Sequence, residues 1–443
     1  MTGLGVGARC HSELEASEQD SLPPAIDGAG IISQRANIGH FASSLRLVTD
    51  AGFGMIMRVV DMGLVDRASG VGGELPAWAE WTRSQPYTVG IEEEAMLLDR
   101  YDGLLVNCGE QVLRGLPPAL RSQASAETHE ATVELASAPH RSAESAARDA
   151  AALRHALAVD LARHNLRAAS AGTHPLAHWT GTKISRGARY KIVYESMREL
   201  ARREPTFGLH VHVGVADAEK AIGLQNRLRA HLPMLLALSA NSPFWQGRDT
   251  GLASARTPIF QAFPRVGVPR AFNSYPEYVE AIDQLLRCGA FPGPTFLWWD
   301  VRLQPALGTV EIRVMDAQTT VAETLALAAF VQTIVHLELE QGYQPDRLVH
   351  ADEVINENRF LAARDGMSAQ FIDPAADQRV SALESLDHLL RTARPHAVDL
   401  GCEDALQQVA EMAHETGASR QRQIAKSHGI GSVASALADL FTE

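Results

Sequence analysis

The chain has 443 residues, 46% of them hydrophobic and 21% charged, values that are ordinary for a soluble globular protein. Its formal net charge of −13 argues against a general basic surface for nucleic acid or anionic membranes. No apolar run approaches the roughly 20 residues that span a bilayer, so we expect no membrane partner. The four cysteines lie far apart without CxxC spacing, which favours a reduced, cytoplasmic setting.

The first 85 residues differ in composition from the rest of the chain. They are rich in Gly, Ala and Ser, and their hydrophobic periodicity is weak. We predict that residues 1–85 form a poorly ordered or loosely attached extension, with at most one short helix within residues 41–63. Residues 86–443 are then expected to form a single domain.

Strands and helices alternate from residue 86 onward. Alternation of apolar and polar residues, or a short apolar run, predicts strands at 87–99, 130–138, 167–175, 205–215 and 309–318. Helical spacing predicts helices at 142–166, 217–240 and 320–340, then a helical C-terminal portion at 351–365, 376–393, 402–416 and 418–440. These elements predict an α+β fold with an antiparallel sheet and helices on one of its faces.

Four of the predicted strands have one apolar face and one charged face. Strand side chains alternate, so in "GIEEE" (90–94) Glu92 and Glu94 share one face while Glu93 lies on the other. The same alternation separates the apolar residues of the other three strands from Glu134, from His210 and His212, and from Glu311 and Arg313. If the strands pair in one sheet, these polar side chains line a shared concave surface.

Such a collection of carboxylates needs compensation. Two carboxylates about 4 Å apart repel by roughly 4 kcal/mol at an effective dielectric near 20. Divalent ions with oxygen ligands relieve this repulsion, and Mg²⁺ commonly binds through carboxylates and substrate phosphates. A structural network of arginine-paired carboxylates is the alternative, less favoured because four strands share the pattern. No GxxxxGK[ST] or GxGxxG motif is present, so ATP, if used, would be bound by the sheet and metal ions.

Several motifs together resemble the ATP-dependent carboxylate–amine ligases of the glutamate–cysteine ligase type 2 family. The resemblance covers residues 86–440 and implies a glutamine-synthetase-like fold, in which a curved antiparallel sheet cups ATP and Mg²⁺, with Mn²⁺ as an alternative ion. The motifs are "GIEEE" (90–94), "GLHVHVGV" (208–215), "LSANSPFWQGRDTGLASAR" (238–256), "TVEIRVMDAQ" (309–318), "NENRFLAARDG" (356–366) and "GASRQRQ" (417–423).

The resemblance also implies roles for individual residues. The expected metal ligands are Glu92, Glu94, Glu127, Glu134, His210 and Glu311. Arg313 is expected to meet the γ-phosphate or the substrate carboxylate, with Glu311 as the second catalytic residue. The expected cofactor-binding residues include His210 and His212. Guanidinium chemistry, rather than the resemblance, adds Arg256, Arg302 and Arg189 as cofactor-binding residues that pair with phosphate or the substrate carboxylate, with surface or structural arginines as the alternative. The basic loop with Lys183 and Arg186 is either a cover for phosphates or a solvated loop, and Trp298 and Trp299 are expected in the core or at the rim.

The reaction implied by the resemblance activates a carboxylate as an acyl phosphate and joins it to an amine. Glutamate, through its γ-carboxylate, and cysteine are the family's substrates, and the expected partners are therefore small molecules, with a homodimer left open. Two alternatives remain at this point. One is a guanidino kinase-like phosphotransferase, which makes no amide, and the other is a non-catalytic nucleotide or metal sensor.

Overall fold

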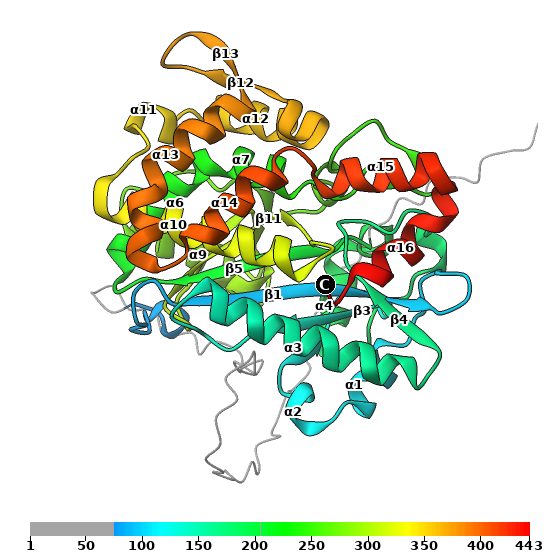
Figure 1. Cartoon of the computed structure of the whole chain (residues 1–443). Coiled ribbons are helices and arrows are strands. Elements are labelled where there is room, and N and C mark those ends of the chain that lie inside the picture. The colour runs from blue at the N-terminus through cyan, green and yellow to red at the C-terminus, as the bar shows by residue number, and fades with distance from the viewer. Residues whose placement is uncertain (1–74, 204) are drawn as a thin grey trace, which may run out of the picture. The chain divides into compact units, whose positions relative to one another are not determined.

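The computed structural model describes residues 75–203 and 205–443, and a seven-stranded antiparallel sheet lies at its centre (Figure 1). The strand order is β10-β11-β5-β1-β3-β2, and β4 pairs with the C-terminal part of β1. The strands are β1 (Val89–Asp99), β2 (Ala124–Ala126), β3 (Thr132–Ala136), β4 (Leu166–Ala169), β5 (Gly208–Gly214), β10 (Val301–Gln304) and β11 (Thr309–Asp316). A strand is present at each predicted position, but the one predicted at 167–175 ends at Ala169, and β2 and β10 were not predicted.

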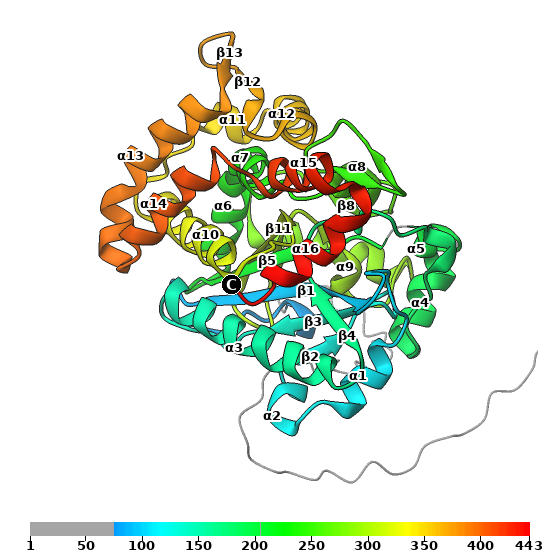
Figure 2. The ribbon, with the colours of Figure 1, turned by 45° about the vertical axis from the view of Figure 1, so that its right-hand side comes forward.

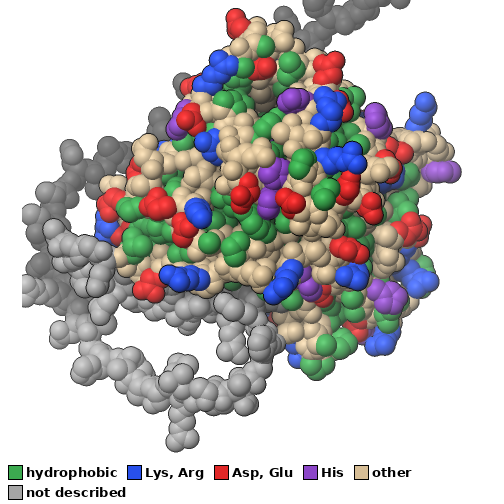
Figure 3. Space-filling model, turned by 60° about the vertical axis from the view of Figure 1, so that its left-hand side comes forward, with side chains coloured by type: hydrophobic (Ala, Val, Ile, Leu, Met, Phe, Trp, Pro, Cys, Tyr) green, Lys and Arg blue, Asp and Glu red, His purple; other side chains and the backbone are tan. Residues whose placement is uncertain are grey.

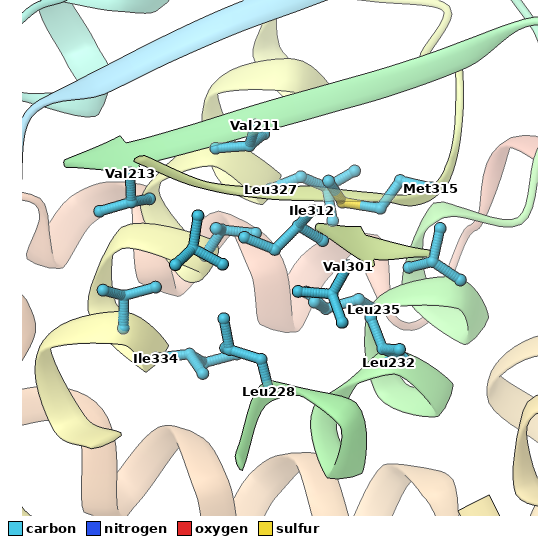
Figure 4. Packing of buried hydrophobic residues seen from close by; sticks show 14 of the residues in the cluster. Val211, Val213, Leu228, Leu232, Leu235, Val301, Ile312, Met315, Leu327 and Ile334 are labelled. Carbon is cyan, nitrogen blue, oxygen red and sulfur yellow. The ribbon is translucent and has the colours of Figure 1, made fainter. Parts of the chain in front are cut away.

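Helices cover the apolar face of the sheet, as predicted. They include α3 (Ala143–Ala162), α6 (Ala218–Leu228), α7 (Leu232–Ser239) and α10 (Val321–Gln341). Val211 and Ile312 of the sheet lie in one buried cluster with Leu235 and Leu327 of the helices (Figure 4). The single helix predicted at 217–240 is split by a 3-10 turn at residues 229–231, directly before Leu232 and Pro233 at the start of α7.

The remaining elements are short or lie in the C-terminal portion. The short helices are α1 (Gly109–Gly115), α2 (Pro118–Arg121), α4 (Ala188–Met197), α5 (Leu200–Arg203), α8 (Arg256–Phe260) and α11 (Asp346–Val349), and α9 (Tyr275–Arg287) is longer. The C-terminal helices are α12 (Asp352–Asp365), α13 (Ala382–Leu400), α14 (Glu403–Met412), α15 (Gly417–His428) and α16 (Val433–Leu440). The two-residue strands are β6 (Phe244–Trp245), β7 (Arg248–Asp249), β8 (Val266–Gly267) and β9 (Trp298–Trp299).

The helix predicted at 376–393 is partly wrong. Residues 370–381 instead form a hairpin of β12 (Gln370–Asp373) and β13 (Gln378–Ser381), which projects from the helices in Figures 1 and 2. Asp377 adopts a positive φ of 51° in the turn, a conformation that Asp tolerates better than most residues. Helix α13 begins only after this hairpin.

The predicted boundary at residue 85 lies too late in the chain. Trp78 and Ala79 are buried in the main core, and the Trp78 Nε1 donates a hydrogen bond to Asp283 at 3.1 Å. The hydroxyl of Tyr275 donates to the carbonyl of Ala79 at 2.6 Å. Residues 75–85 are therefore part of the folded unit. The predictions for residues 1–74, including the helix within 41–63, lie outside the described residues.

Three further features concern the expected cellular setting and partners: the most apolar helix, the cysteines and the surface charge. Among the described helices, α10 is long and apolar enough to cross a membrane, but 78% of its most apolar window is buried, as in the core helix of a folded domain. Cys108, Cys288 and Cys402 are free, and Cys10 lies outside the described residues. On the face shown in Figure 3, acidic and basic side chains are interspersed and the basic ones do not gather into a stripe.

Candidate functional site

Strand register brings the predicted polar residues onto one face of the sheet. Each of these pairs lies directly opposite in neighbouring strands: Glu92 and His210, Glu94 and Glu134, His212 and Glu311, and Arg302 and Glu311. The register of β11 against β5 shifts between Ile312 and Met315, so Arg313 lies in an irregularity that can redirect its side chain. We call this set of side chains, with Arg313, the acidic face.

Two groups of potential metal ligands lie on the acidic face and share Glu92. One contains Glu92, Glu134 and His210, the other Glu92, His212 and Glu311, and within each group the ligand atoms lie within 4.8 Å of one another. Glu92 is 3.3 Å from the Nδ1 of His210 and 3.3 Å from the Nε2 of His212. His212 was predicted to bind the cofactor and not the metal. The structure therefore adds His212 to the predicted metal ligands.

The donor set of these two groups fits a divalent cation. The Nε2 of His212 is buried without a hydrogen-bond partner, while its Nδ1 lies 3.1 Å from the hydroxyl of Thr309. A second ring nitrogen held in this way is typical of a metal-binding histidine. Carboxylates with imidazole suit Mn²⁺ as well as Mg²⁺.

Arginines already balance part of the charge at Glu311. Arg302 lies 2.8 Å from its carboxylate, and Arg313 also pairs with it. Burial by itself would raise the pKa of Glu311, but Arg302 and Arg313 outweigh it and hold the pKa well below its ordinary value. The arginine-paired network considered as an alternative therefore describes Glu311 well, although it does not account for the other carboxylates.

The negative charge at the opposite end of the acidic face is compensated only in part. Burial and the nearby Glu127 raise the pKa of Glu94 to about 8, and burial and Glu92 raise the pKa of Glu134 well above its ordinary value. The backbone N–H of Gly208 donates to Glu94 at 2.6 Å. Glu94 on the acidic face and Glu127 near it lie outside both ligand groups, so the structure brings them together with the predicted metal ligands without adding them to the groups.

Arg256 is a buried cation with unused donors. Within residues 75–203 and 205–443, its guanidinium donates hydrogen bonds only to the carbonyls of Val314 at 3.3 Å and Arg313 at 3.4 Å, and its Nε has no hydrogen-bond partner. A Cβ at Gly208 would lie 2.5 Å from the Nη2 of Arg256, so glycine is needed for this close approach. Buried, underused guanidinium groups beside the acidic face suit an anionic ligand.

A buried aspartate, which the sequence did not single out, organises the chain around Arg256. The carboxylate of Asp316 accepts hydrogen bonds from Ser242 at 2.7 Å and Ser254 at 2.9 Å, and also from the N–H of Asn241 at 2.8 Å. The hydroxyl of Ser242 in turn accepts from the N–H of Arg256 at 3.1 Å. Asp316 is the last residue of β11, the strand that carries Glu311. Its place in that strand is the one feature of the sequence that could have marked it as a functional residue.

The other predicted cofactor-binding residues lie elsewhere. Arg189 donates to the hydroxyl of Thr295 at 3.1 Å and lies over the ring of Phe296. Lys183 and Arg186 line a pocket beside α1. Trp298 and Trp299 are partly buried at the edge of the core, as expected. In the part of the chain that the structure describes, Arg189, Lys183 and Arg186 form no hydrogen bond or ion pair with the ligand groups, so their proposed roles remain predictions.

Glu93 lies on the opposite face, as predicted, and its partner is Arg154. The guanidinium of Arg154 donates to both carboxylate oxygens of Glu93, at 2.9 and 2.5 Å, and the hydroxyl of Thr324 adds a bond of 2.6 Å. Arg154 is fully buried and also donates to the carbonyl of Phe441. The three consecutive glutamates thus divide between the acidic face and a structural ion pair beneath it.

Comparison with known proteins identifies the class to which this fold and site belong. The fold resembles that of a glutamate–cysteine ligase from Francisella tularensis solved in complex with AMP, with a TM-score of 0.62, 14% identity, and coverage of 82% of this chain and 90% of that one. A bifunctional glutathione synthetase from Pasteurella multocida has a TM-score of 0.62 and 14% identity, covering 80% of this chain and 52% of that one. The predicted fold class is therefore confirmed.

Sequence comparison gives the family. The family model described as glutamate–cysteine ligase family 2 matches residues 88–439. A Rubrobacter xylanophilus protein named "Putative glutamate--cysteine ligase 2-1" is 40% identical over 344 residues, 77% of this chain and 91% of the relative. A Sorangium cellulosum relative named "Putative glutamate--cysteine ligase 2" is 37% identical over 342 residues, 76% and 91% of the two chains. The chain belongs to glutamate–cysteine ligase family 2, which confirms the predicted resemblance and makes it a ligase.

Proposed function

We propose that the protein is an ATP-dependent carboxylate–amine ligase that activates the γ-carboxylate of glutamate and joins it to cysteine or another amine. The observation that carries this proposal is the pair of ligand groups sharing Glu92, with the buried Arg256 and the partly buried Arg313 beside them. Cations and guanidinium groups on one surface suit the polyphosphate of ATP and the charge that develops during phosphoryl transfer. The AMP bound to the Francisella neighbour supports a nucleotide as ligand of this fold.

In the proposed reaction, some of these side chains bind metal ions and others orient the phosphate and the substrate. Glu92, Glu134, His210, His212 and Glu311 would hold Mg²⁺ or Mn²⁺, which when bound neutralises phosphate charge. Arg313 and Arg256 would orient the γ-phosphate and the substrate carboxylate.

The proposed reaction has two covalent steps. A carboxylate oxygen of glutamate attacks the γ-phosphorus, so that the bond to the β-phosphate oxygen breaks and an acyl phosphate and ADP form. The lone pair of the neutral amine then attacks the acyl carbon. Phosphate leaves, the ammonium proton is lost to a base or solvent, and an amide remains. No cysteine nucleophile is needed, because both steps depend on charge neutralisation and in-line positioning.

Hydroxylamine tests the proposal directly, because it replaces the natural amine as a small nucleophile. Glutamate, ATP, Mg²⁺ and hydroxylamine should give a γ-hydroxamate with one ADP for each product, and Arg313→Ala should suppress both. A panel of other amino acids and dicarboxylates belongs in the same assay. If ATP binds and no carboxylate yields a hydroxamate, the ligase proposal fails. ADP with a phosphorylated guanidine would indicate the kinase alternative, and binding without turnover the sensor. A cytoplasmic setting and small-molecule partners accompany the proposal.

A further inference from the structure

Two adjoining pockets lie at the outer edge of the sheet, beside α1 and β2. The first has a volume of about 200 Å³ and is lined chiefly by charged side chains: Glu110 and Arg114 from α1, Glu130 before β3, and Lys183 and Arg186 before α4. The second, of about 260 Å³, shares Glu110, Arg114 and Arg186 and adds the apolar side chains of Leu113 and Ala126. A charged chamber thus opens beside a partly apolar one, and none of the lining residues belongs to the acidic face.

The charges of the first pocket are close together but not hydrogen-bonded. The Nε of Arg186 lies 3.9 Å from Glu110 and 3.8 Å from Glu130, and Arg114 lies 3.5 Å from Glu110. These separations are longer than good charge-assisted hydrogen bonds. Within residues 75–203 and 205–443, no side-chain hydrogen bond is formed by any of the five charged groups. The side chain of Glu130 is only 14% exposed, so water reaches it only in part, whereas the side chains of Glu110, Arg114 and Arg186 are 44%, 69% and 82% exposed and can meet water.

Backbone hydrogen bonds fix the walls of this pocket. The N–H of Glu130 donates to the carbonyl of Lys183 at 2.8 Å, and the N–H of Gly109 donates to the carbonyl of Glu130 at 2.7 Å. The side chain of Asn107 accepts from the N–H of Lys183 at 3.0 Å. Three segments distant in sequence are therefore tied together around the charged groups. The backbone around the pocket is therefore ordered before a ligand binds, and only the exposed side chains lose freedom on binding.

We propose that the two pockets bind a free aliphatic α-amino acid. Its ammonium would lie against Glu130 and Glu110, and its carboxylate against Lys183, Arg114 and Arg186, because each group then gains the hydrogen bonds that the side chains leave unused. Its aliphatic side chain would lie against Leu113 and Ala126 in the second pocket. The charged chamber has the volume of about seven waters in the liquid, which suits a small zwitterionic head. This site is independent of the ligase reaction proposed above.

Calorimetric titration of the full chain with L-valine, without ATP or metal ions, tests the site. Isobutylamine lacks the carboxylate of valine and isovalerate lacks its ammonium, so both should bind at least about tenfold more weakly. Glu130→Gln and Arg186→Gln should each weaken valine binding about tenfold. Glu144→Gln and Arg148→Gln, the same changes at exposed positions on α3, should leave it unchanged.

Three results would overturn the proposal. The first is that alanine, valine and leucine all fail to bind, and the second is that the two pocket variants bind valine as the wild type does. The third is that Mg²⁺ with a non-hydrolysable ATP analogue displaces valine by simple competition, which would place the amino acid on the acidic face. Since no turnover is measured, failure here leaves the hydroxamate test of the ligase unaffected, and the reverse also holds.

Discussion

Replacing Glu93 with glutamine should destabilise the protein strongly, because the carboxylate balances a buried guanidinium. Glu93 accepts two hydrogen bonds from Arg154 and one from Thr324, and the side chains of Glu93 and Arg154 are 4% and 0% exposed. Glutamine keeps the shape and one acceptor oxygen, but its amide presents N–H groups to the donors of Arg154. Removing one partner of a buried ion pair typically costs about 3–5 kcal/mol, and we expect Glu93→Gln to fall in this range.

Urea unfolding followed by circular dichroism measures this free energy. Glu411→Gln is the matched control, because it makes the same change at an exposed glutamate that forms no ion pair with the described residues, and it should shift the free energy of unfolding by less than about 0.5 kcal/mol. Arg154→Met should cost less in the Glu93→Gln background than in the wild type, since the two side chains act as a pair. A loss below about 1 kcal/mol for Glu93→Gln would refute the reasoning.

Three more outcomes follow from the structure. Glu94→Gln should lower turnover at least about a hundredfold with the fold intact, because bound cations would lower the raised pKa of Glu94 and hold it as a carboxylate, a charge that glutamine lacks; near-wild-type turnover at saturating Mg²⁺ would show that a neutral side chain suffices. Trp78→Ala should cost about 3 kcal/mol in urea unfolding, because the indole is in the core and bonded to Asp283; an unchanged midpoint would show that residues 75–85 do not contribute to stability. Burial lowers the pKa of His174 in the folded state. Below about pH 6.5, the unfolded state therefore binds a proton at this histidine that the folded state does not bind. Stability should therefore fall between pH 7.5 and 5, and less so in His174→Gln; an equal fall in both would contradict this.

The acidic face could be predicted from sequence because strand periodicity is strict. A one-residue step separates Glu93 from Glu92 and Glu94, and the register of β1 against β5 then places Glu92 opposite His210. The start of helix α3 at Ser142 could likewise be predicted, because serine is a preferred N-cap residue. In the structure its side chain accepts a hydrogen bond from the N–H of Ser145. Local patterns of this kind need no knowledge of the tertiary fold.

What the sequence could not provide depended on long-range contacts. Arg154 lies 61 residues from Glu93, and nothing local marks it as the partner. The role of Asp316 appears only when Ser242 and Ser254 come together around it. Trp78 lies in a segment of weak periodicity, so composition placed it outside the domain although its indole packs into the core.

Glu92 belongs to both ligand groups, and the central claim is that the acidic face holds the divalent cations that serve ATP. Electron paramagnetic resonance of free Mn²⁺, titrated with the full chain and a non-hydrolysable ATP analogue, tests this claim most directly. Glu92→Gln should weaken Mn²⁺ binding at least about tenfold, because one charged ligand is lost from both groups. Glu144→Gln, an exposed control on α3, should bind as the wild type does. Equal Mn²⁺ affinity for wild type and Glu92→Gln would contradict the assignment of the acidic face as the metal site.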